Sequence, residues 1–311
     1  MIYVVGSSNT DMVVKSDKLP MPGETVMGGN FLMNPGGKGA NQALSASRLG
    51  GKVSFICKVG NDLFGKQALQ QFKRENIRTD FIVTDPHLPS GVALINVDTD
   101  GENCISVAPG ANSSLRPSEV ILAFDDLTPA DILLIQLEIP LDTVVFTIQA
   151  AFEKNVKVIL NPAPAQDLSD DVLKCLYLIT PNETEAELLT GIRVVNDATA
   201  EQAAAILVGR GCQNVIITLG SKGAFLFTEN KGKVIPAPAV TAVDTTAAGD
   251  CFNGALAVAI SEGTPLDEAV SFACKVAAIS VTRMGAQSSI PLRKEVDQLP
   301  LLNQIHPLSN L

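Results

Sequence analysis

The chain has 311 residues, of which 46% are hydrophobic and 18% are charged, and its formal net charge is −10. This hydrophobic fraction excludes global disorder and is enough for one large core. The negative charge disfavours binding to nucleic acid or to an anionic membrane, so any site for a polyanion such as ATP must be built locally, from backbone N–H groups, helix ends and bound cations.

The cysteines and the apolar runs indicate a cytoplasmic protein. None of the six cysteines belongs to a C-x-x-C pair or has a His neighbour, which disfavours a zinc site or a redox motif. The apolar run at the N-terminus is too short for a signal peptide, and no apolar stretch approaches the ~20 residues that span a bilayer. We therefore expect reduced cysteines packed in the core and no membrane partner. The cysteines are Cys57, Cys104, Cys175, Cys212, Cys251 and Cys274.

The start of the chain predicts a buried strand followed by irregular structure. An apolar run at 2–5 ends at Gly6, which is typical of a buried strand. From 12 to 34, Pro and Gly divide the chain into short strand-like pieces without helical periodicity. From Gly39 onward, small and apolar residues recur at helical spacing until Gly50, a natural helix stop.

The next segments indicate a strand, a helix and a hairpin. Residues 53–60 form an apolar run, and residues 65–76 follow with helical spacing. Residues 90–109 are typical of two strands joined by a turn at Asp100–Gly101. With the strand-like pieces at 12–34, this hairpin predicts a small separate sheet.

From residue 131 onward, strands and helices alternate, which predicts a parallel sheet covered by helices. A further strand is expected at 234–243, and two helices, at about 249–262 and 266–283, close the chain. The apolar runs of the alternating units begin at Ile132, Val156, Tyr177 and Asn214.

The most informative motif is VDTTAAGDCFNGA at 243–255, where a loop of small residues opens directly into an apolar helix. Ala248, Gly249 and Asp250 fall at the helix N-terminus, where up to four N–H groups lack partners and the macrodipole adds about half a positive charge. Small side chains would let a phosphate reach these amides. By spacing alone, a plain helix-capping Asp is the commoner interpretation, but such a cap does not require a run of small residues.

Two further motifs have ordinary explanations when taken alone. NPGGKGANQA at 34–43 is not a Walker A loop, because Lys38 is followed by Gly39, and a Gly-rich turn before a helix would explain it. TPNETE at 180–185 places acidic residues in the first turn of a predicted helix, which is common helix-start chemistry.

Taken together, these motifs resemble the signatures of the ribokinase family of sugar kinases, also called the phosphofructokinase-B type. The likeness runs from residue 2 to about residue 295, with the motifs in the expected order. The segments resemble the anion hole (243–255), the N-terminal signature (34–43), the pair that organises magnesium (180–185), the nucleotide-contacting turn (218–223) and the C-terminal part of the monovalent-cation loop (285–289).

The resemblance implies a fold and an assembly. It implies a ribokinase-like three-layer α/β sandwich, with a mostly parallel central sheet and a small β-sheet lid. We expect a single α/β kinase domain over 1–311, with a discontinuous lid formed by about 12–34 and 90–109. A small sheet with exposed edges and an apolar face is an awkward monomer, so we expect the lids of two subunits to pair in a homodimer.

The resemblance also implies a reaction, the ATP-dependent phosphorylation of D-ribose at its 5-hydroxyl to give ribose 5-phosphate and ADP. A kinase for 2-deoxyribose, another small sugar or a nucleoside is the nearest alternative. A sugar-binding protein without activity would have no use for a base such as Asp250 beside a phosphate site. A dinucleotide-dependent oxidoreductase is disfavoured, because Gly6, Ser7 and Ser8 stand where G-x-G-x-x-G is expected.

Carried onto this sequence residue by residue, the resemblance assigns roles to the site. Asp250 is the expected base, and the anion hole consists of Ala247, Ala248 and Gly249. The sugar is bound by Asn9, Asp11, Gly37, Lys38, Gly39, Ala40, Asn41, Glu138 and Asp250. The nucleotide is bound by Asn182, Thr218, Leu219, Gly220, Ser221, Lys222, Gly223, Gly249 and Cys274.

Two metal ions are also implied. Mg²⁺ accompanies ATP and is held through water by Glu185, since magnesium prefers hard oxygen ligands. K⁺ acts as a monovalent activator, with Arg283 and Gly285 contributing backbone oxygens. The implied potassium ligands are Asp244, Thr246, Ser280, Arg283, Gly285 and Ser289.

Overall fold

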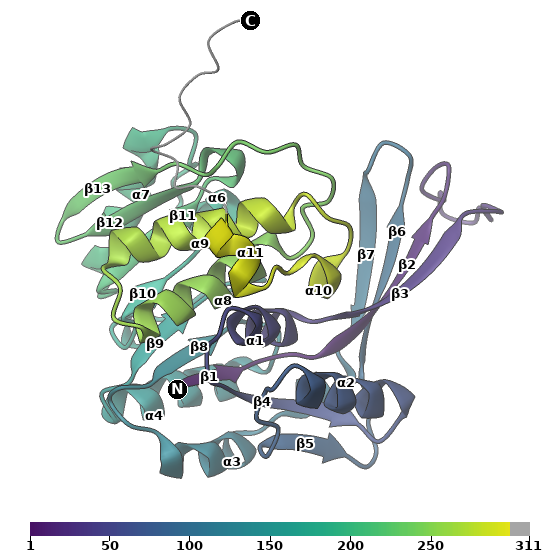
Figure 1. The fold of residues 1–311 in the computed structure, drawn as a ribbon, viewed down its shortest axis with the longest axis horizontal. Coiled ribbons are helices and arrows are strands. Elements are labelled where there is room, and N and C mark those ends of the chain that lie inside the picture. Colours follow the sequence, from purple (N-terminus) through teal and green to yellow (C-terminus); the bar gives the residue numbers. More distant parts are fainter. Residues whose placement is uncertain (299–311) are drawn as a thin grey trace, which may run out of the picture.

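The computed structural model of the protein describes residues 1–298. Its main body is a nine-stranded sheet with helices on both faces, and a separate four-stranded sheet projects from one side of that body (Figure 1). Within the described residues, no helix is both long and apolar enough to cross a membrane.

The large sheet is parallel except at one edge, as predicted. Every pair of neighbouring strands is parallel from β5 to β11, whereas β11–β12 and β12–β13 are antiparallel. From that antiparallel edge the strands are β13 (Lys231–Ile235), β12 (Ala224–Thr228), β11 (Asn214–Thr218), β10 (Leu178–Ile179), β9 (Lys157–Leu160), β8 (Ile132–Ile135), β1 (Ile2–Val5), β4 (Val53–Gly60) and β5 (Ile82–Asp85).

Helices cover both faces of this sheet, which confirms the three-layer prediction. One face is covered by α1 (Lys38–Arg48), α2 (Leu63–Arg74), α8 (Ala248–Ser261), α9 (Leu266–Ser280) and α11 (Arg293–Gln298). The other face is covered by α3 (Pro117–Val120), α4 (Leu141–Glu153), α5 (Asp170–Leu173), α6 (Glu183–Thr190) and α7 (Asp197–Gly209). The remaining short elements are α10 (Ala286–Ser289) and the 3₁₀ turns η1 (Gly110–Ser114), η2 (Ile121–Asp126) and η3 (Gly220–Lys222).

Alternation along a strand explains why the core has two halves. In β1, Ile2 and Val4 belong to the apolar cluster under α1, α8 and α9, whereas Tyr3 and Val5 belong to the cluster on the other face. All four side chains are buried. Successive side chains of a strand point to opposite faces, so a strand covered on both sides reads as continuously apolar.

The four-stranded sheet is formed by the two segments predicted to make the lid, and the first of these segments is slightly longer than expected. Its order is β3 (Asn30–Gly36), β2 (Asn9–Lys15), β6 (Gly91–Val97) and β7 (Asn103–Ala108), with β2 and β6 parallel. The sheet therefore begins at Asn9 and reaches Gly36, because β2 continues almost directly from β1. Both faces carry exposed apolar side chains: Phe31, Met33 and Leu94 lie on one face, and Leu32, Ile105 and Val107 lie on the other.

Two expectations were wrong in detail. No strand covers 234–243: β13 ends at Ile235 and a loop follows, because Pro236 and Pro238 cannot donate ladder hydrogen bonds. Cys104 is exposed on β7 rather than packed in the core, since this strand of the lid has only solvent-exposed positions. All six cysteines are free thiols.

Candidate active site

The residues predicted to bind a sugar meet where β1, β8 and the N-termini of α1 and α8 come together. Asn9 and Asp11 lie on β2, which leaves the carboxyl end of β1. The Lys38 amide donates to Glu138 Oε2 at 3.0 Å, and Asn41 Nδ2 donates to Asp250 Oδ2 at 2.9 Å. Four chain segments far apart in sequence therefore supply one polar site, at the edge where open α/β sheets bind ligands.

Glycine at position 36 is required by the close approach of Asp11. A Cβ on Gly36 would lie 2.2 Å from the Asp11 carboxylate, far inside van der Waals contact. Gly39 has a similar role, because its Cβ would lie 2.6 Å from the Ser7 amide. Gly36 and Gly39 thus let the start of α1 lie close to Asp11 and to the backbone that follows β1.

The carboxylates of the site act on one another. Burial, reinforced by the charges of Glu138 and Asp250, raises the pKa of Asp11 to about 6. Burial also disfavours the charged form of Lys38, yet the surrounding carboxylates outweigh burial and raise the pKa of Lys38. These carboxylates are Asp250, Glu138, Glu185 and Asp11. The ammonium of Lys38 is therefore the central positive charge of the site, although the sequence pointed only to its backbone.

Asp250 is a buried carboxylate at the start of α8. Its Oδ2 accepts from Asn41 Nδ2 and its Oδ1 accepts from Gln42 Nε2, both at 2.9 Å. Burial raises the pKa of Asp250, and the charge of Lys38 together with the two amide donors opposes that rise. A simple helix cap would be exposed and would accept from its own helix, so this geometry favours a functional carboxylate.

Asn112 orients Asn9, and local sequence gave no sign of it. Asn112 is only 1% exposed; its Nδ2 donates to Asn9 Oδ1 at 2.7 Å, and its Oδ1 accepts from the Ser8 amide at 2.9 Å. The partners are more than a hundred positions apart in the chain, which is why only the folded chain reveals the contact.

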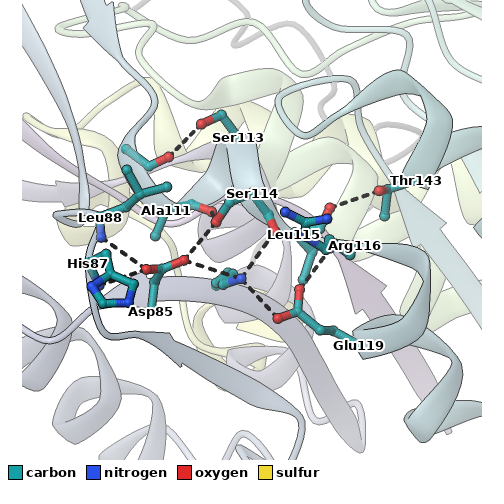
Figure 2. A network of polar contacts seen from close by, with 12 residues as sticks. Asp85, His87, Leu88, Ala111, Ser113, Ser114, Leu115, Arg116, Glu119 and Thr143 are labelled. Carbon is teal, nitrogen blue, oxygen red and sulfur yellow. Dashed lines mark hydrogen bonds and ion pairs between the residues drawn. The ribbon is translucent and has the colours of Figure 1, made fainter.

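A buried ion cluster fixes the η1 turn that carries Asn112. Asp85 accepts from the amides of His87 and Leu88 and from Ser114 Oγ (Figure 2). Lys58 Nζ lies 3.2 Å from Asp85 Oδ2 and 2.9 Å from Glu119 Oε1. The cluster ties η1 to β4, β5 and α3, and so holds Asn112 in place beside Asn9.

The segment predicted to form the anion hole is the first turn of α8 and the residue before it. Ala247 adopts a left-handed backbone with φ 59°, and the helical ladder starts with Cys251 N donating to Ala247 O. The Ala248 amide turns back to Thr245 O at 3.2 Å, so the amides of Gly249 and Asp250 are the ones best placed for an anion. A Cβ on Gly249 would meet no atom within 4 Å, which shows open space beside these amides.

A cavity of about 410 Å³ opens beside the anion hole. Its walls are the β11–β12 turn, the loop after β13, and one side of α8 and α9. Most lining side chains are small or apolar, a composition that suits the flat face of a nucleotide base. The predicted nucleotide residues that line it are Thr218, Gly220, Ser221, Gly223, Gly249 and Cys274.

The other predicted nucleotide residues lie off this wall. Leu219 packs in the apolar core, and neither Lys222 nor Asn182 lines the cavity. Ala237, Val240 and several other residues of the loop after β13 line it without having been predicted. The Pro- and Ala-rich run of this loop is visible in the sequence, but its apolar composition favours a strand.

The predicted magnesium pair forms a helix cap. Asn182 Oδ1 accepts from the Glu185 amide at 2.8 Å, and Glu185 Oε2 accepts from the Asn182 amide at 2.9 Å. Burial raises the pKa of Glu185, the charge of Lys38 lowers it, and that of Asp250 raises it. Glu185 thus lies within electrostatic reach of Asp250, and its Oε1 is not used by the cap, which leaves an oxygen suited to a magnesium-bound water.

The segments predicted to bind potassium lie side by side. Asp244 Oδ1 accepts from Thr246 Oγ1 and Asp244 Oδ2 accepts from the Gly285 amide at 2.8 Å. Although burial alone would raise it, hydrogen bonds from Thr246 and Gly285 lower the pKa of Asp244. The hydroxyls of Ser280 and Ser289 donate to carbonyls of their own helices. The lone pairs of the hydroxyl oxygens can therefore still coordinate a cation. Carboxylate, hydroxyl and carbonyl oxygens of this kind fit a hard monovalent ion.

The chain is similar to known proteins both in sequence and in fold. The sequence profile described as "pfkB family carbohydrate kinase" matches residues 1–293. A ribokinase of Haemophilus influenzae is 47% identical over 294 residues, which cover 94% of this chain and 96% of that protein. A deoxyribokinase of Salmonella typhi is 37% identical over 306 residues, covering 97% and 99%. The structure of an Arabidopsis thaliana ribokinase complexed with ribose and ATP superimposes with a TM-score of 0.88, at 32% identity, covering 96% of this chain and 97% of that one.

Proposed function

The chain belongs to the pfkB family of carbohydrate kinases, and we propose that it transfers the γ-phosphoryl group of ATP to the 5-hydroxyl of D-ribose, giving ribose 5-phosphate and ADP. One observation carries the proposal: the buried carboxylate of Asp250 lies in the same helical turn as the amides that border the nucleotide-sized cavity. A base and a phosphate site are thereby held a few ångströms apart on one rigid element.

Asp250 is the group that receives the proton of the attacking hydroxyl. Asn41 and Gln42 each donate to one of its oxygens, which stabilises the ionised form and keeps the carboxylate aimed at the sugar side. The amides of Gly249 and Asp250 stabilise charge that develops on the transferred group, and each well-aimed donor of this kind contributes up to ~3 kcal/mol.

The sugar is held by polar side chains of β2 and of the segment that follows β8, together with Asn41 of α1 and Asp250 of α8. Asp11 accepts from the 2,3-diol, because a carboxylate can accept from two neighbouring hydroxyls. Asn9, oriented by Asn112, and Glu138, held by the Lys38 amide, supply the remaining contacts. Asn9 and Glu138 are already fixed by these hydrogen bonds, so little ordering of the two side chains is needed when the sugar binds.

Two cations complete the proposal. Glu185 would hold magnesium-bound water, and Mg²⁺ neutralises phosphate charge when it accompanies ATP. Asp244 and the carbonyls of the 280–289 segment would hold K⁺ behind the anion hole. The hydrogen bond between Gly285 and Asp244 supports this, because it brings both ligand segments together.

The apolar face of the lid supports the proposal of a homodimer, and the free thiols support a location in the cytoplasm. The lid's apolar face around Phe31 and Leu94, both more than half exposed, would be buried if two lids packed together. The free thiols agree with a reducing compartment. Sedimentation at micromolar concentration should give a dimer, and a clean monomer would contradict the shared lid.

A sugar panel with a coupled ADP assay tests the substrate. We expect turnover on D-ribose and a kcat/KM on 2-deoxyribose lower by up to about 10⁴-fold, because a site built to bond a hydroxyl is left unpaired by the analogue. Equal or faster turnover on 2-deoxyribose would make the protein a deoxyribose kinase. If no sugar in the panel leads to ADP formation, the proposal is rejected.

A further inference from the structure

Gln42 is a buried amide that contacts the candidate base but cannot reach the sugar. Its side chain has no solvent exposure. Gln42 Nε2 donates to Asp250 Oδ1 at 2.9 Å and to Asn161 Oδ1 at 3.0 Å, and Gln42 Oε1 accepts from Gln136 Nε2 at 2.7 Å. Both hydrogens of the amide nitrogen are therefore used, one of them on the base.

The neighbours of Gln42 fix which way its amide faces. An ionised carboxylate only accepts hydrogen bonds, so Asp250 requires a donor from Gln42. Asn161 also presents its oxygen to Gln42, because its own Nδ2 donates to Thr180 O at 3.3 Å. A flipped Gln42 amide would place its oxygen against two acceptors and its nitrogen against the Gln136 donor, so only one orientation satisfies the whole set.

The same hydrogen bonds continue to the anion hole. Thr180 Oγ1 donates to Asn253 Oδ1 at 2.6 Å, and Asn253 Nδ2 donates to Gly249 O at 2.8 Å. The chain of contacts thus leaves the base, crosses the carboxyl ends of β9 and β10, and returns to the peptide next to the base. Its members are all buried: Gln136, Gln42, Asn161, Thr180 and Asn253.

We propose that Gln42 is a positioning residue, whose buried side-chain amide fixes the Asp250 carboxylate and ties it to the first turn of α8. The two donors to the base then have different tasks. Asn41 lies at the predicted sugar side and is itself oriented by Gln287 Nε2 at 3.0 Å, whereas Gln42 lies behind the base. Because each carboxylate oxygen receives one amide, each keeps a lone pair for the sugar hydroxyl.

Removal of the Gln42 donor changes the electrostatic balance at the base. Burial disfavours the charged form of Asp250, and the donors from Asn41 and Gln42 oppose burial. The charged groups that act on Asp250 are Lys38, which favours ionisation, and Glu138, Asp11 and Glu185, which disfavour it. With one donor gone, the carboxylate becomes harder to ionise, and activity that needs the ionised form requires a higher pH.

The test is the pH profile of kcat/KM for ribose in the variant Gln42→Met, which keeps the volume of the side chain and removes its hydrogen bonds. It rests on the proposed function, so the wild-type protein is measured first. We expect the acid limb to move to higher pH by about one unit, the equivalent of one charge-assisted hydrogen bond. Part of the lost activity should return at alkaline pH.

A matched control separates positioning from general damage. Asn214 is a similarly buried amide remote from the base, with Nδ2 donating to Tyr177 O at 3.0 Å and Oδ1 accepting from Thr228 Oγ1 at 2.6 Å. Asn214→Leu should lower the melting temperature and leave the acid limb unmoved. If Gln42→Met does not fold, Gln136→Leu, which removes the donor that orients Gln42, should give a smaller shift in the same direction.

The outcomes are distinguishable. An active wild type with acid limbs unmoved in both Gln42→Met and Gln136→Leu overturns the positioning role. A wild type without ribose phosphorylation instead rejects the function on which the inference rests, whatever the variants do.

Discussion

The two halves of the active site are built in opposite ways. The sugar half is made of charged and amide side chains that are buried and bonded to one another, such as Asn41 with Asp250 and Asn112 with Asn9. The nucleotide half is made of small and apolar residues, such as Ala237 and Cys274, around an open cavity with backbone amides at its end. Polar groups fixed in advance select one arrangement of hydroxyls, whereas an apolar slot with a helix terminus binds a flat base and a phosphate by shape and dipole.

This difference shows where the protein gives up stability for function. Carboxylates crowd the sugar half, and both Asp11 and Asp250 are harder to ionise there than in water. Because that crowding disfavours the folded state at neutral pH, it is expected only where the chemistry needs it. The nucleotide half has no such crowding of carboxylates, so substitutions there should change nucleotide affinity without changing the free energy of unfolding.

The largest effect should come from Asp250→Asn, which removes the base and leaves the shape of the sugar half. We expect kcat to fall by about 10³-fold or more, since a positioned general base contributes up to about 10⁴-fold. Calorimetry should still detect ribose and ATP binding. As a control, the exposed lid variant Asp17→Asn should keep full turnover. A fall in kcat of less than tenfold would remove Asp250 as the base.

The next effect should come from Asp11→Asn, which separates function from stability within the sugar half. We expect KM for ribose to rise by about 10- to 100-fold, because a charged acceptor is lost. At pH 7 the melting temperature should rise by about 2 °C. The pKa of Asp11 is about 6 in the folded protein and about 3.9 in an unfolded chain, so its contribution to stability is present below pH ~4 and is lost as pH rises through 6.

Melting temperatures measured between pH 4 and pH 7 test the direction of this effect on stability. The gain in melting temperature of Asp11→Asn should shrink as the pH is lowered from 7 and vanish near pH 4. A variant that is less stable than the wild type at pH 7 would show that the ionised carboxylate is not a burden on the fold.

A smaller effect is expected on the nucleotide half from Gly249→Ala. The added Cβ meets no protein atom within 4 Å, so the melting temperature should stay constant, while the methyl group enters the space beside the anion-hole amides. We expect KM for ATP to rise about tenfold, equivalent to one weakened hydrogen bond. Gly209→Ala, on α7 and also in open space, is the matched control and should be silent. An unchanged KM for ATP would place the phosphate elsewhere.

The smallest effect should follow from exchanging the monovalent cation. With sodium in place of potassium, we expect a severalfold lower turnover, because the proposed ion only supports the loop behind the anion hole. Asp244→Ala should remove the difference between the two cations. Identical wild-type rates with and without potassium would contradict the cation site.

Residue patterns within single segments predicted most of the helices and strands. The continuous apolar runs predicted a parallel sheet, and the lid hairpin at 90–109 has its turn where Asp100–Gly101 indicated. The prediction of a strand at 234–243 was wrong, because Pro236 and Pro238 end the ladder of hydrogen bonds although the run is apolar. The Pro- and Ala-rich run after Ile235 forms a loop that lines the cavity, not a strand.

The α/β architecture, the small-residue start of the helix at 248 and the carboxylate of Asp250 within it could be predicted from local patterns, because periodicity, helix capping and backbone access depend on residues close in the chain. The groups that contact that carboxylate are known only from the folded chain. Gln42, Asn161 and Lys38 come from other elements, and their hydrogen bonds and charges depend on distances between segments more than a hundred residues apart, which no local pattern specifies.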